Sequence, residues 1–290
     1  MVPHVRELGP PGAVARRSAH LRPGGLRFRR GGAGRAFSLL ELLIVVALMT
    51  LLAALLLPGL ARAGRQARSV QCASNLRQLG HALHMYAADY RGMAMPLAYF
   101  SDWPLTYWYG RESTGGIDQT GGFVWPYLRS EVREWGVYEC PEQPGGTFDR
   151  YQGAGQTVTT TYGYNGYFLS PAATPGWAGQ IGHRPWKKLD DLARPQELFV
   201  FADTMIDWFG ELKNCALLDP PFLYRPPRYW YRNASPTTCF RHDWTANAVH
   251  ADGHVAGAAP HPDLVTSAAF RLGSAGPDNA PRYVPDWREW

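Results

Sequence analysis

The chain has 290 residues, of which 46% are hydrophobic and 18% charged, so an intrinsically disordered protein is excluded and one sizeable core with extensions fits. The net charge of +5 originates in residues 1–36, with eight arginines and one acid; removing these from the 29 basic and 24 acidic side chains leaves 21 and 23, a net charge of −2. Because residues 37–290 carry a net negative charge, they offer no cationic surface for phosphate, and we expect no nucleic-acid partner.

Residues 1–36 form the first predicted segment, a basic leader. It is rich in glycine, proline and arginine and lacks apolar periodicity, so we expect it to be disordered. Residues 37–57, FSLLELLIVVALMTLLAALLL, follow as a predicted transmembrane helix, because about 20 apolar residues at 1.5 Å each span a hydrocarbon core of about 30 Å. The arginines before this segment predict a cytoplasmic N-terminus. The alternative, a secretory signal cut near Ala61–Ala63, fits less well because the apolar run is long and an arginine separates the two alanines.

Glu41 is the one charged residue in this apolar span. A carboxylate without a partner is costly in a membrane and therefore indicates a function. Cleavage of the chain before Phe37 would create a free amine one helical turn away. In an assembly, the Glu41 carboxylate of one subunit would then neutralise the terminal amine of its neighbour. The alternative is a glutamate tolerated because it reaches the membrane edge.

The segment Ala36–Glu41, AFSLLE, resembles the prepilin peptidase site of type IV pilins and type II secretion pseudopilins. The resemblance implies cleavage after Ala36, methylation of the new amine on Phe37, and assembly through Glu41. It also implies a kinked membrane helix packed on an antiparallel sheet, an α+β pilin-like fold. Pro58 falls where those pilins often place a helix-bending proline. One departure is Ala36, since glycine is the commonest residue before the cut.

The same resemblance implies partners and a location. The partners are prepilin peptidase, other pseudopilin subunits and the bacterial inner membrane, which the chain crosses once with its C-terminal domain periplasmic, or extracellular after assembly. The implied role is structural, in a type II secretion or type IV pilus-like system, without catalysis. The alternative is a membrane-anchored or secreted envelope enzyme or ligand-binding protein with a metal site near His242–Asp252.

Residues 58–92 are predicted to continue the helix outside the membrane. Pro58 should kink the helix rather than end it, and Gly92 is a plausible stop. Apolar residues recur in steps of three and four, which indicates one buried stripe. The stripe consists of Leu76, Leu79, Leu83, Tyr86 and Tyr90.

Residues 93–290 are predicted to form a β-rich domain, since short runs here are broken by glycine and proline. We expect strands within 156–169, which has Asn165-Gly166 as a turn candidate, and within 197–203. In 247–256, NAVHADGHVA, the pair Asp252-Gly253 suits a type I′ hairpin. The many aromatic residues, such as Trp108, are expected to fill the core rather than to form a sugar-binding platform.

This domain also resembles a group of large pseudopilin-like proteins of Planctomycete- and Verrucomicrobium-type bacteria. Those proteins end with a histidine, nine residues and Asp-Gly, and here His242 is followed by nine residues and Asp252-Gly253. Cys140-Pro141 and the phrases TYGYNGY and LFVFADT are further landmarks of the group. The resemblance implies an envelope pseudopilin.

Two metal sites are conceivable in the domain, although neither is our favoured prediction. Asp203, Asn247 and Asp252, near His242, offer the oxygen ligands that calcium prefers, and some pseudopilins bind calcium in this domain. His250 and His254 offer transition-metal ligands, but the turn between them favours a hairpin with surface histidines. We therefore expect no cofactor, with calcium as the alternative.

The four cysteines would face an oxidising compartment if the predicted topology is right. Four cysteines allow three pairings, and we predict Cys215–Cys239 with Cys72–Cys140 as its complement. None of the cysteines has the local spacing of a zinc site.

Overall fold

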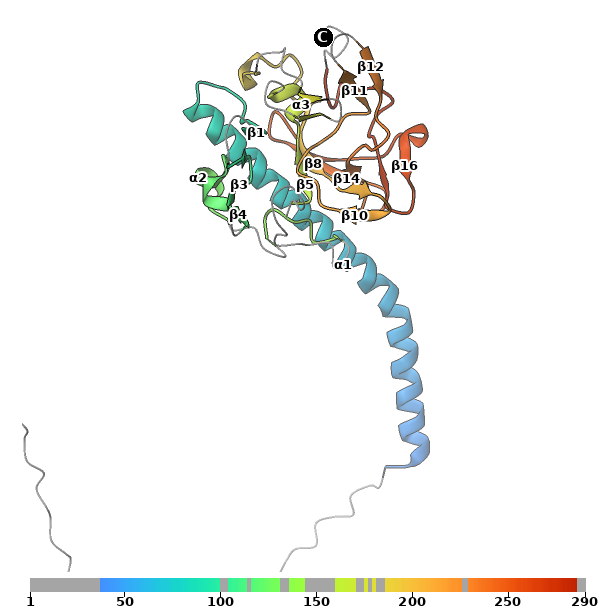
Figure 1. Ribbon diagram of the computed structural model, residues 1–290. Helices are drawn as coiled ribbons and strands as arrows, with labels where there is room; N and C mark the ends of the chain where they lie inside the picture. Colours follow the sequence, from blue (N-terminus) through green and yellow to red (C-terminus); the bar gives the residue numbers. More distant parts are fainter. Residues whose placement is uncertain are drawn as a thin grey trace, which may run out of the picture. The chain divides into compact units, whose positions relative to one another are not determined.

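The computed structural model describes residues 37–99, 104–113, 116–130, 136–143, 160–170, 175–176, 179–180, 186–225 and 229–285 (Figure 1). The chain divides into two units, Met1–Ala54 and Leu55–Trp290, which we describe separately. The predicted leader 1–36, including Ala36, lies outside the described residues. The chain is an α+β protein, a long apolar N-terminal helix followed by antiparallel sheets, as predicted.

The long helix α1 runs from Leu39 to Asp89 without ending at Pro58. In the first unit its side chains are all exposed, and no residue of its most apolar 18-residue window is buried in the structure. Within the described part of the chain, α1 is the one helix long and apolar enough to cross a membrane. These properties agree with the single membrane span predicted from the sequence.

In the second unit, α1 buries the predicted stripe of apolar residues. Leu76, Leu79 and Leu83 are fully buried, and Cys72 extends the stripe one turn toward the N-terminus. Tyr90 differs from the prediction: its side chain is 52% exposed because the helix has ended, and its ring stacks on that of Tyr86.

The predicted helix end is confirmed at the turn after Asp89. The Gly92 N–H donates to the carbonyl of Ala87 over 2.7 Å, and Gly92 has a φ of +80°. This left-handed conformation is easily adopted by glycine, which explains why the helix stops here.

The central sheet contains four antiparallel strands in the order β15-β14-β8-β5, of which Figure 1 labels β5, β8 and β14. They are β5 (Tyr162–Tyr164), β8 (Phe199–Asp203), β14 (Ala246–His250) and β15 (Val255–Ala258). Every residue of β8 and β14 is buried, which confirms the buried strand predicted within 197–203 and the hairpin within 247–256. Helix α1 packs on this sheet at Gly80, where an added Cβ would lie 2.8 Å from a methyl group of Val249.

The turn between β14 and β15 is not the predicted type I′ turn. His250 N–H donates to the His254 carbonyl, and Gly253 N–H donates to the His250 carbonyl. Of the turn residues, Gly253 alone has a positive φ, +91°, whereas type I′ needs positive φ at both central positions. The hairpin therefore uses a three-residue loop with glycine at its left-handed position.

Short elements complete the second unit. One four-stranded antiparallel sheet contains β1 (Ala98–Tyr99), β2 (Thr106–Tyr107), β3 (Gly110–Ser113) and β4 (Gly116–Asp118). A three-stranded sheet contains β13 (Thr238–Cys239), β16 (Val265–Ser267) and β17 (Leu272–Gly273). Three further sheets have two strands each. They consist of β6 (Pro175–Gly176) with β7 (Gly179–Gln180), β9 (Ile206–Trp208) with β10 (Glu211–Lys213), and β11 (Phe222–Arg225) with β12 (Tyr229–Arg232). The short helices are η1 (Gln119–Gly121), α2 (Trp125–Leu128), α3 (Gly166–Leu169), η3 (Leu189–Asp191) and η4 (Pro262–Leu264).

Aromatic side chains pack inside this unit. Trp108 is fully buried, and its ring lies edge-on to that of Phe201 with centroids 5.1 Å apart. Its indole N–H donates to the carbonyl of Ala216 over 3.1 Å, which satisfies the one polar atom of the side chain. Trp108 is thus a core residue, as predicted.

Asn165-Gly166 is not the predicted turn but the start of α3. The Asn165 side-chain oxygen accepts from the N–H of Phe168, as an N-cap does. Its amide nitrogen donates to the carbonyls of Phe199 and Tyr283, both over 2.8 Å. Asn165 therefore connects α3, β8 and the C-terminal segment through three hydrogen bonds, and 1% of it is exposed.

Asn165→Ala should lower the free energy of unfolding by about 2–4 kcal/mol, because it leaves two buried carbonyls and one helix N–H without partners. Denaturant unfolding of the full chain in detergent would measure the loss. Ser113→Ala is the control, since its hydroxyl makes one partly buried hydrogen bond, to the Gly116 carbonyl. Equal stability of the Asn165→Ala variant and the control would contradict this role.

Candidate functional site

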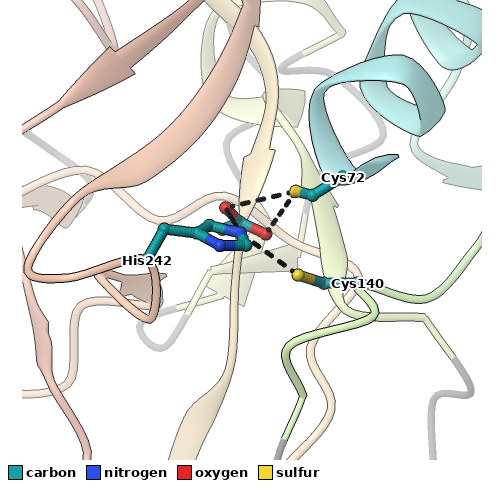
Figure 2. A group of neighbouring side chains, drawn as sticks. Cys72, Cys140 and His242 are labelled. Carbon is teal, nitrogen blue, oxygen red and sulfur yellow. Dashed lines mark hydrogen bonds and ion pairs between the residues drawn. The ribbon is translucent and has the colours of Figure 1, made fainter. Parts of the chain in front are cut away.

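Among the residues that the structure describes, four side chains with metal-ligating atoms converge in the second unit (Figure 2). Cys72 comes from α1, Cys140 from the turn segment 136–143, Asp203 from the end of β8, and His242 from the turn before β14. All four are buried, and one ligand atom from each lies within 4.8 Å of the others. We call these four residues the CCDH cluster.

The contacts within the CCDH cluster are direct. The Cys72 thiol donates to Asp203 Oδ1 over 3.3 Å. His242 Nε2 lies 3.2 Å from the Cys140 sulfur and 3.3 Å from Asp203 Oδ2. One imidazole nitrogen is thus directed at a sulfur and a carboxylate oxygen at once, although it carries at most one proton.

The opposite ring nitrogen of His242 has its own partner. Nδ1 lies 2.9 Å from Glu142 Oε2, and Glu142 Oε1 lies 4.0 Å from a guanidinium nitrogen of Arg68 on α1. A carboxylate at Nδ1 holds a proton on that nitrogen, so that a metal replacing the Nε2 proton would meet a lone pair directed into the cluster.

The backbone that presents His242 is strained. Asp243 and Trp244 follow it with φ of 51° and 63°, two successive non-glycine residues in the left-handed region. His242 and Thr245 close the loop with two backbone hydrogen bonds, of 3.0 and 2.9 Å. Such strain persists where the surrounding structure enforces it, and it is concentrated at functional sites.

Asp203 is a fully buried carboxylate with several partners. The Asn247 N–H donates to Oδ2 over 2.8 Å, and Arg241 Nε lies 3.8 Å from Oδ1. Burial alone would raise the pKa of Asp203, but the Arg241 cation and the hydrogen bond with His242 outweigh it and hold the pKa below its usual value. Asp203 is therefore ionised.

The protonation of the other three residues follows from their contacts. Burial lowers the pKa of His242, but hydrogen bonds to Asp203 and Cys140 outweigh this and raise it to about 10. Burial raises the pKa of Cys140, whereas the hydrogen bond with Cys72 and the charge of Arg241 bring it down to about 7. Burial raises the pKa of Cys72, and its contacts with Cys140 and Asp203 raise it further. The metal-free cluster thus contains one acidic and one protonated thiol.

The predicted calcium ligands are not brought together. Asp203 and Asn247 are neighbours, but Asn247 presents its backbone N–H to Asp203, and its side-chain amide donates to Ser69. Asp252 lies beyond the other end of β14, in the hairpin turn, where its Oδ1 is 2.6 Å from His254 Nδ1. The residues around Asp203 are sulfur and nitrogen ligands, which calcium disfavours.

The His242-x9-Asp252-Gly253 motif therefore splits between two places. His242 belongs to the CCDH cluster, while Asp252 and Gly253 form the hairpin turn. The His250 and His254 rings stack with centroids 3.9 Å apart. His250 is not the predicted surface histidine, because it is 7% exposed and burial lowers its pKa to about 4.

Neither predicted disulfide is formed, since all four cysteines are free. The Cys215 thiol donates to the carbonyl of Leu217, and the Cys239 thiol to that of Phe270, so this pair makes separate contacts. Cys72 and Cys140 lie close together, as their predicted pairing requires, but both are free thiols. Cys72 contacts Asp203, and Cys140 contacts His242.

The sequence analysis did not predict that Cys72 and Cys140 belong to such a cluster, nor that Glu142 contacts His242 and Arg241 contacts Asp203. The four members of the CCDH cluster are separated by 39 residues or more in the chain, so no local spacing marks them. The one available signal was the helical step of four from Cys72 to Leu76, which places Cys72 on the buried stripe.

Glu41 makes a contact that was also missed. Its Oε2 accepts from the N–H of Ser38 over 2.9 Å, and its own N–H donates to the Ser38 hydroxyl over 3.1 Å. This reciprocal pair is a capping box at the start of α1. The signal was present in the sequence as Ser-Leu-Leu-Glu before an apolar run.

Fold and site together define an α+β protein with one candidate membrane-spanning helix and a buried cluster of metal-ligating side chains. Residues 62–111, from the C-terminal part of α1 into β3, match the family model described as "Protein of unknown function (DUF1559)". Comparison with the curated proteins found no match, nor did comparison with the solved structures.

Proposed function

We propose that the chain is a pseudopilin-like subunit, cut between Ala36 and Phe37 and methylated on the new amine. It is held in the bacterial inner membrane by residues 37–57 with its N-terminus cytoplasmic, and its C-terminal domain is periplasmic, or extracellular after assembly. Prepilin peptidase and other pseudopilin subunits are its partners in a type II secretion or type IV pilus-like system. Its role in this proposal is structural.

The observation that carries the proposal is the division of α1 into two kinds of surface. From Leu39 to Ala54 every side chain is exposed, and all but Glu41 and Thr50 are apolar. Beyond Arg68 the same helix buries one face in the core of the second unit. An apolar helix surface of this length needs lipid or the helices of neighbouring subunits around it.

Glu41 and Pro58 have separate roles in this proposal. Glu41 binds the terminal amine of a neighbouring subunit after cleavage. Pro58 lacks a backbone N–H, so the helix is missing one hydrogen bond there and bends more easily during assembly.

The experiment that tests the proposal is mass spectrometry of the mature N-terminus, with the protein purified from the membranes of cells that contain prepilin peptidase. The expected N-terminal peptide begins with methylated Phe37, and cells without the peptidase should yield the uncut chain. An intact arginine-rich leader in peptidase-containing cells would contradict the proposal. So would a mature chain that begins after Ala63, because the membrane segment would then be a secretory signal.

The alternative is a membrane-anchored or secreted envelope enzyme or ligand-binding protein with a metal site near His242–Asp252, and such a site requires a metal position open to substrate or ligand. The CCDH cluster offers four protein side chains to a metal, which suits a closed structural site. We therefore retain the structural role as the proposed function.

A further inference from the structure

We propose that Cys72, Cys140, Asp203 and His242 bind one Zn²⁺ ion, which fastens helix α1 to the turn segment 136–143, to β8 and to the loop before β14. This inference does not depend on the proposed function, since an anchored protein of any class would use such a site in the same way.

The types of ligand atom in the cluster indicate which metal it would bind. Two thiolates, one imidazole and one carboxylate are ligands of tetrahedral zinc sites, whereas calcium and magnesium require oxygen ligands. Zn–S bonds of about 2.3 Å and Zn–N or Zn–O bonds of about 2.0–2.2 Å place neighbouring ligand atoms about 3.3–3.8 Å apart around a tetrahedron, the two sulfurs being farthest apart. In the structure His242 Nε2 lies 3.2 Å from the Cys140 sulfur and 3.3 Å from Asp203 Oδ2, and the same Oδ2 lies 3.6 Å from the Cys72 sulfur.

The orientation of His242 supports metal binding. Nε2 is directed at two acceptors and cannot donate a proton fully to both. A metal ion between the three atoms would replace that proton and use the Nε2 lone pair. Nδ1 would then donate to Glu142 Oε2, 2.9 Å away, in the carboxylate–histidine–zinc arrangement that orients ligands in many zinc sites.

The charges around the cluster balance once zinc is bound. Zn²⁺ with two thiolates, one carboxylate and a neutral imidazole carries a net charge of −1. Arg241, 6% exposed, supplies +1, and its Nε lies 3.8 Å from Asp203 Oδ1. Arg241 Nε and Nη1 have no hydrogen-bond partner in the described structure, so an adjacent anionic metal complex would compensate this buried cation.

A disulfide between Cys72 and Cys140 would explain fewer of these features. It would convert both thiols into an uncharged disulfide beside Asp203 and His242, which could not serve as two thiolate ligands. The strained loop after His242 and the Glu142 contact at Nδ1 orient the imidazole toward the Cys140 sulfur and Asp203, and such orientation has no use beside a disulfide.

A pocket of about 290 Å³ lies beside the cluster and is lined by residues of α1, by the turn segment and by the loop before β14: Arg62, Arg65, Gln66, Ser69, Glu142, His242 and Asp243. The pocket thus meets the cluster at His242, the residue whose Nδ1 faces Glu142.

The test uses the full chain, purified in detergent with a thiol reductant and zinc, then freed of loosely bound ions. Elemental analysis should find about one zinc per chain. Exchange with cobalt should produce the intense visible bands of tetrahedral Co²⁺ and the near-ultraviolet bands of thiolate-to-cobalt charge transfer. Cobalt spectra of the unmodified chain report on the site even if a variant fails to fold.

Variants assign the ligands. Cys72→Ser and His242→Gln should each lower zinc affinity by tenfold or more, and Glu142→Gln by about 10–100-fold, because it orients a ligand. His242→Cys should retain zinc, since a third thiolate replaces the imidazole. Cys215→Ser, a cysteine outside the CCDH cluster, should bind zinc as the unmodified chain does.

Three outcomes would overturn the proposal. The first is a reduced, folded chain without zinc or cobalt bands. The second is stoichiometric zinc that survives both Cys72→Ser and Cys140→Ser. The third is a chain isolated anaerobically from the envelope whose Cys72 and Cys140 form a disulfide, shown by peptide mass and by resistance to alkylation.

Discussion

Glu41→Ala and Glu41→Gln should both leave the chain inserted in the membrane but reduce its incorporation into an assembly by tenfold or more. In the proposed function, the Glu41 carboxylate neutralises the amine that cleavage creates on Phe37 of a neighbouring subunit. Neither alanine nor glutamine carries the negative charge, so both variants leave that amine without a partner in the membrane. The measurement is cross-linking of subunits in membranes, with total membrane-bound chain as the reference.

The capping box at Ser38 and Glu41 offers a second explanation for impaired assembly of the Glu41 variants. Variants of the same two residues distinguish the two explanations. Glutamine at position 41 can still accept from the Ser38 N–H and complete the capping box, whereas alanine cannot. Ser38→Ala removes the hydroxyl of the capping box but keeps the acid. If Glu41 acts only as a helix cap, Glu41→Gln assembles normally and Ser38→Ala is impaired. If the negative charge of Glu41 is what matters, Glu41→Gln is impaired and Ser38→Ala assembles normally.

The two functions of Glu41 are compatible because they belong to different stages. In the uncut precursor, the carboxylate satisfies one of the helix N–H groups that have no intrahelical partner. In the proposed function the cut chain begins at Phe37, one residue before Ser38, so the same carboxylate lies near a new cation in its own chain and in its neighbours. Cleavage would thereby add a charged partner to the neutral one.

The sequence predicted those elements in which local pattern and burial agree. The steps of three and four in α1 correspond to one buried face, and FVFAD forms β8 because a continuous apolar run suits a strand buried on both sides. Asn165-Gly166 was misread because the same pair suits a hairpin turn and a helix start. The choice between them depends on Phe199 and Tyr283, whose carbonyls Asn165 binds and which are distant in the chain.

The site could be predicted only in part, for a related reason. The landmarks around Asp203, Asn247 and His242 do lie together, because β8 and β14 are neighbouring strands. The alternative calcium site included Asp252 as well, but strand β14 lies between His242 and the hairpin turn that contains Asp252. Cys72 and Cys140 become ligands only when α1 and the turn segment pack on the sheet, and no spacing in the sequence encodes that contact.

Asp203 and Arg241 should be strongly coupled energetically, and a double-mutant cycle would show it. Asp203→Leu leaves a buried guanidinium 3.8 Å from the position of its lost counter-ion and should lower the free energy of unfolding by about 3–5 kcal/mol. Arg241→Met should cause a smaller loss, because the His242 imidazole, 3.3 Å from Asp203 Oδ2, remains as a cationic partner.

The double variant Asp203→Leu/Arg241→Met should be less destabilised than the sum of the two single variants, since it leaves neither charge unpaired. The measurement is denaturant unfolding of the full chain in detergent, reduced and treated with a chelator, so that loss of a bound ion does not enter the comparison. Losses that add to within about 0.5 kcal/mol would show that the two residues act independently. Coupling without metal would instead identify Arg241 as the residue that keeps Asp203 ionised, and hence able to act as a ligand, before any ion binds.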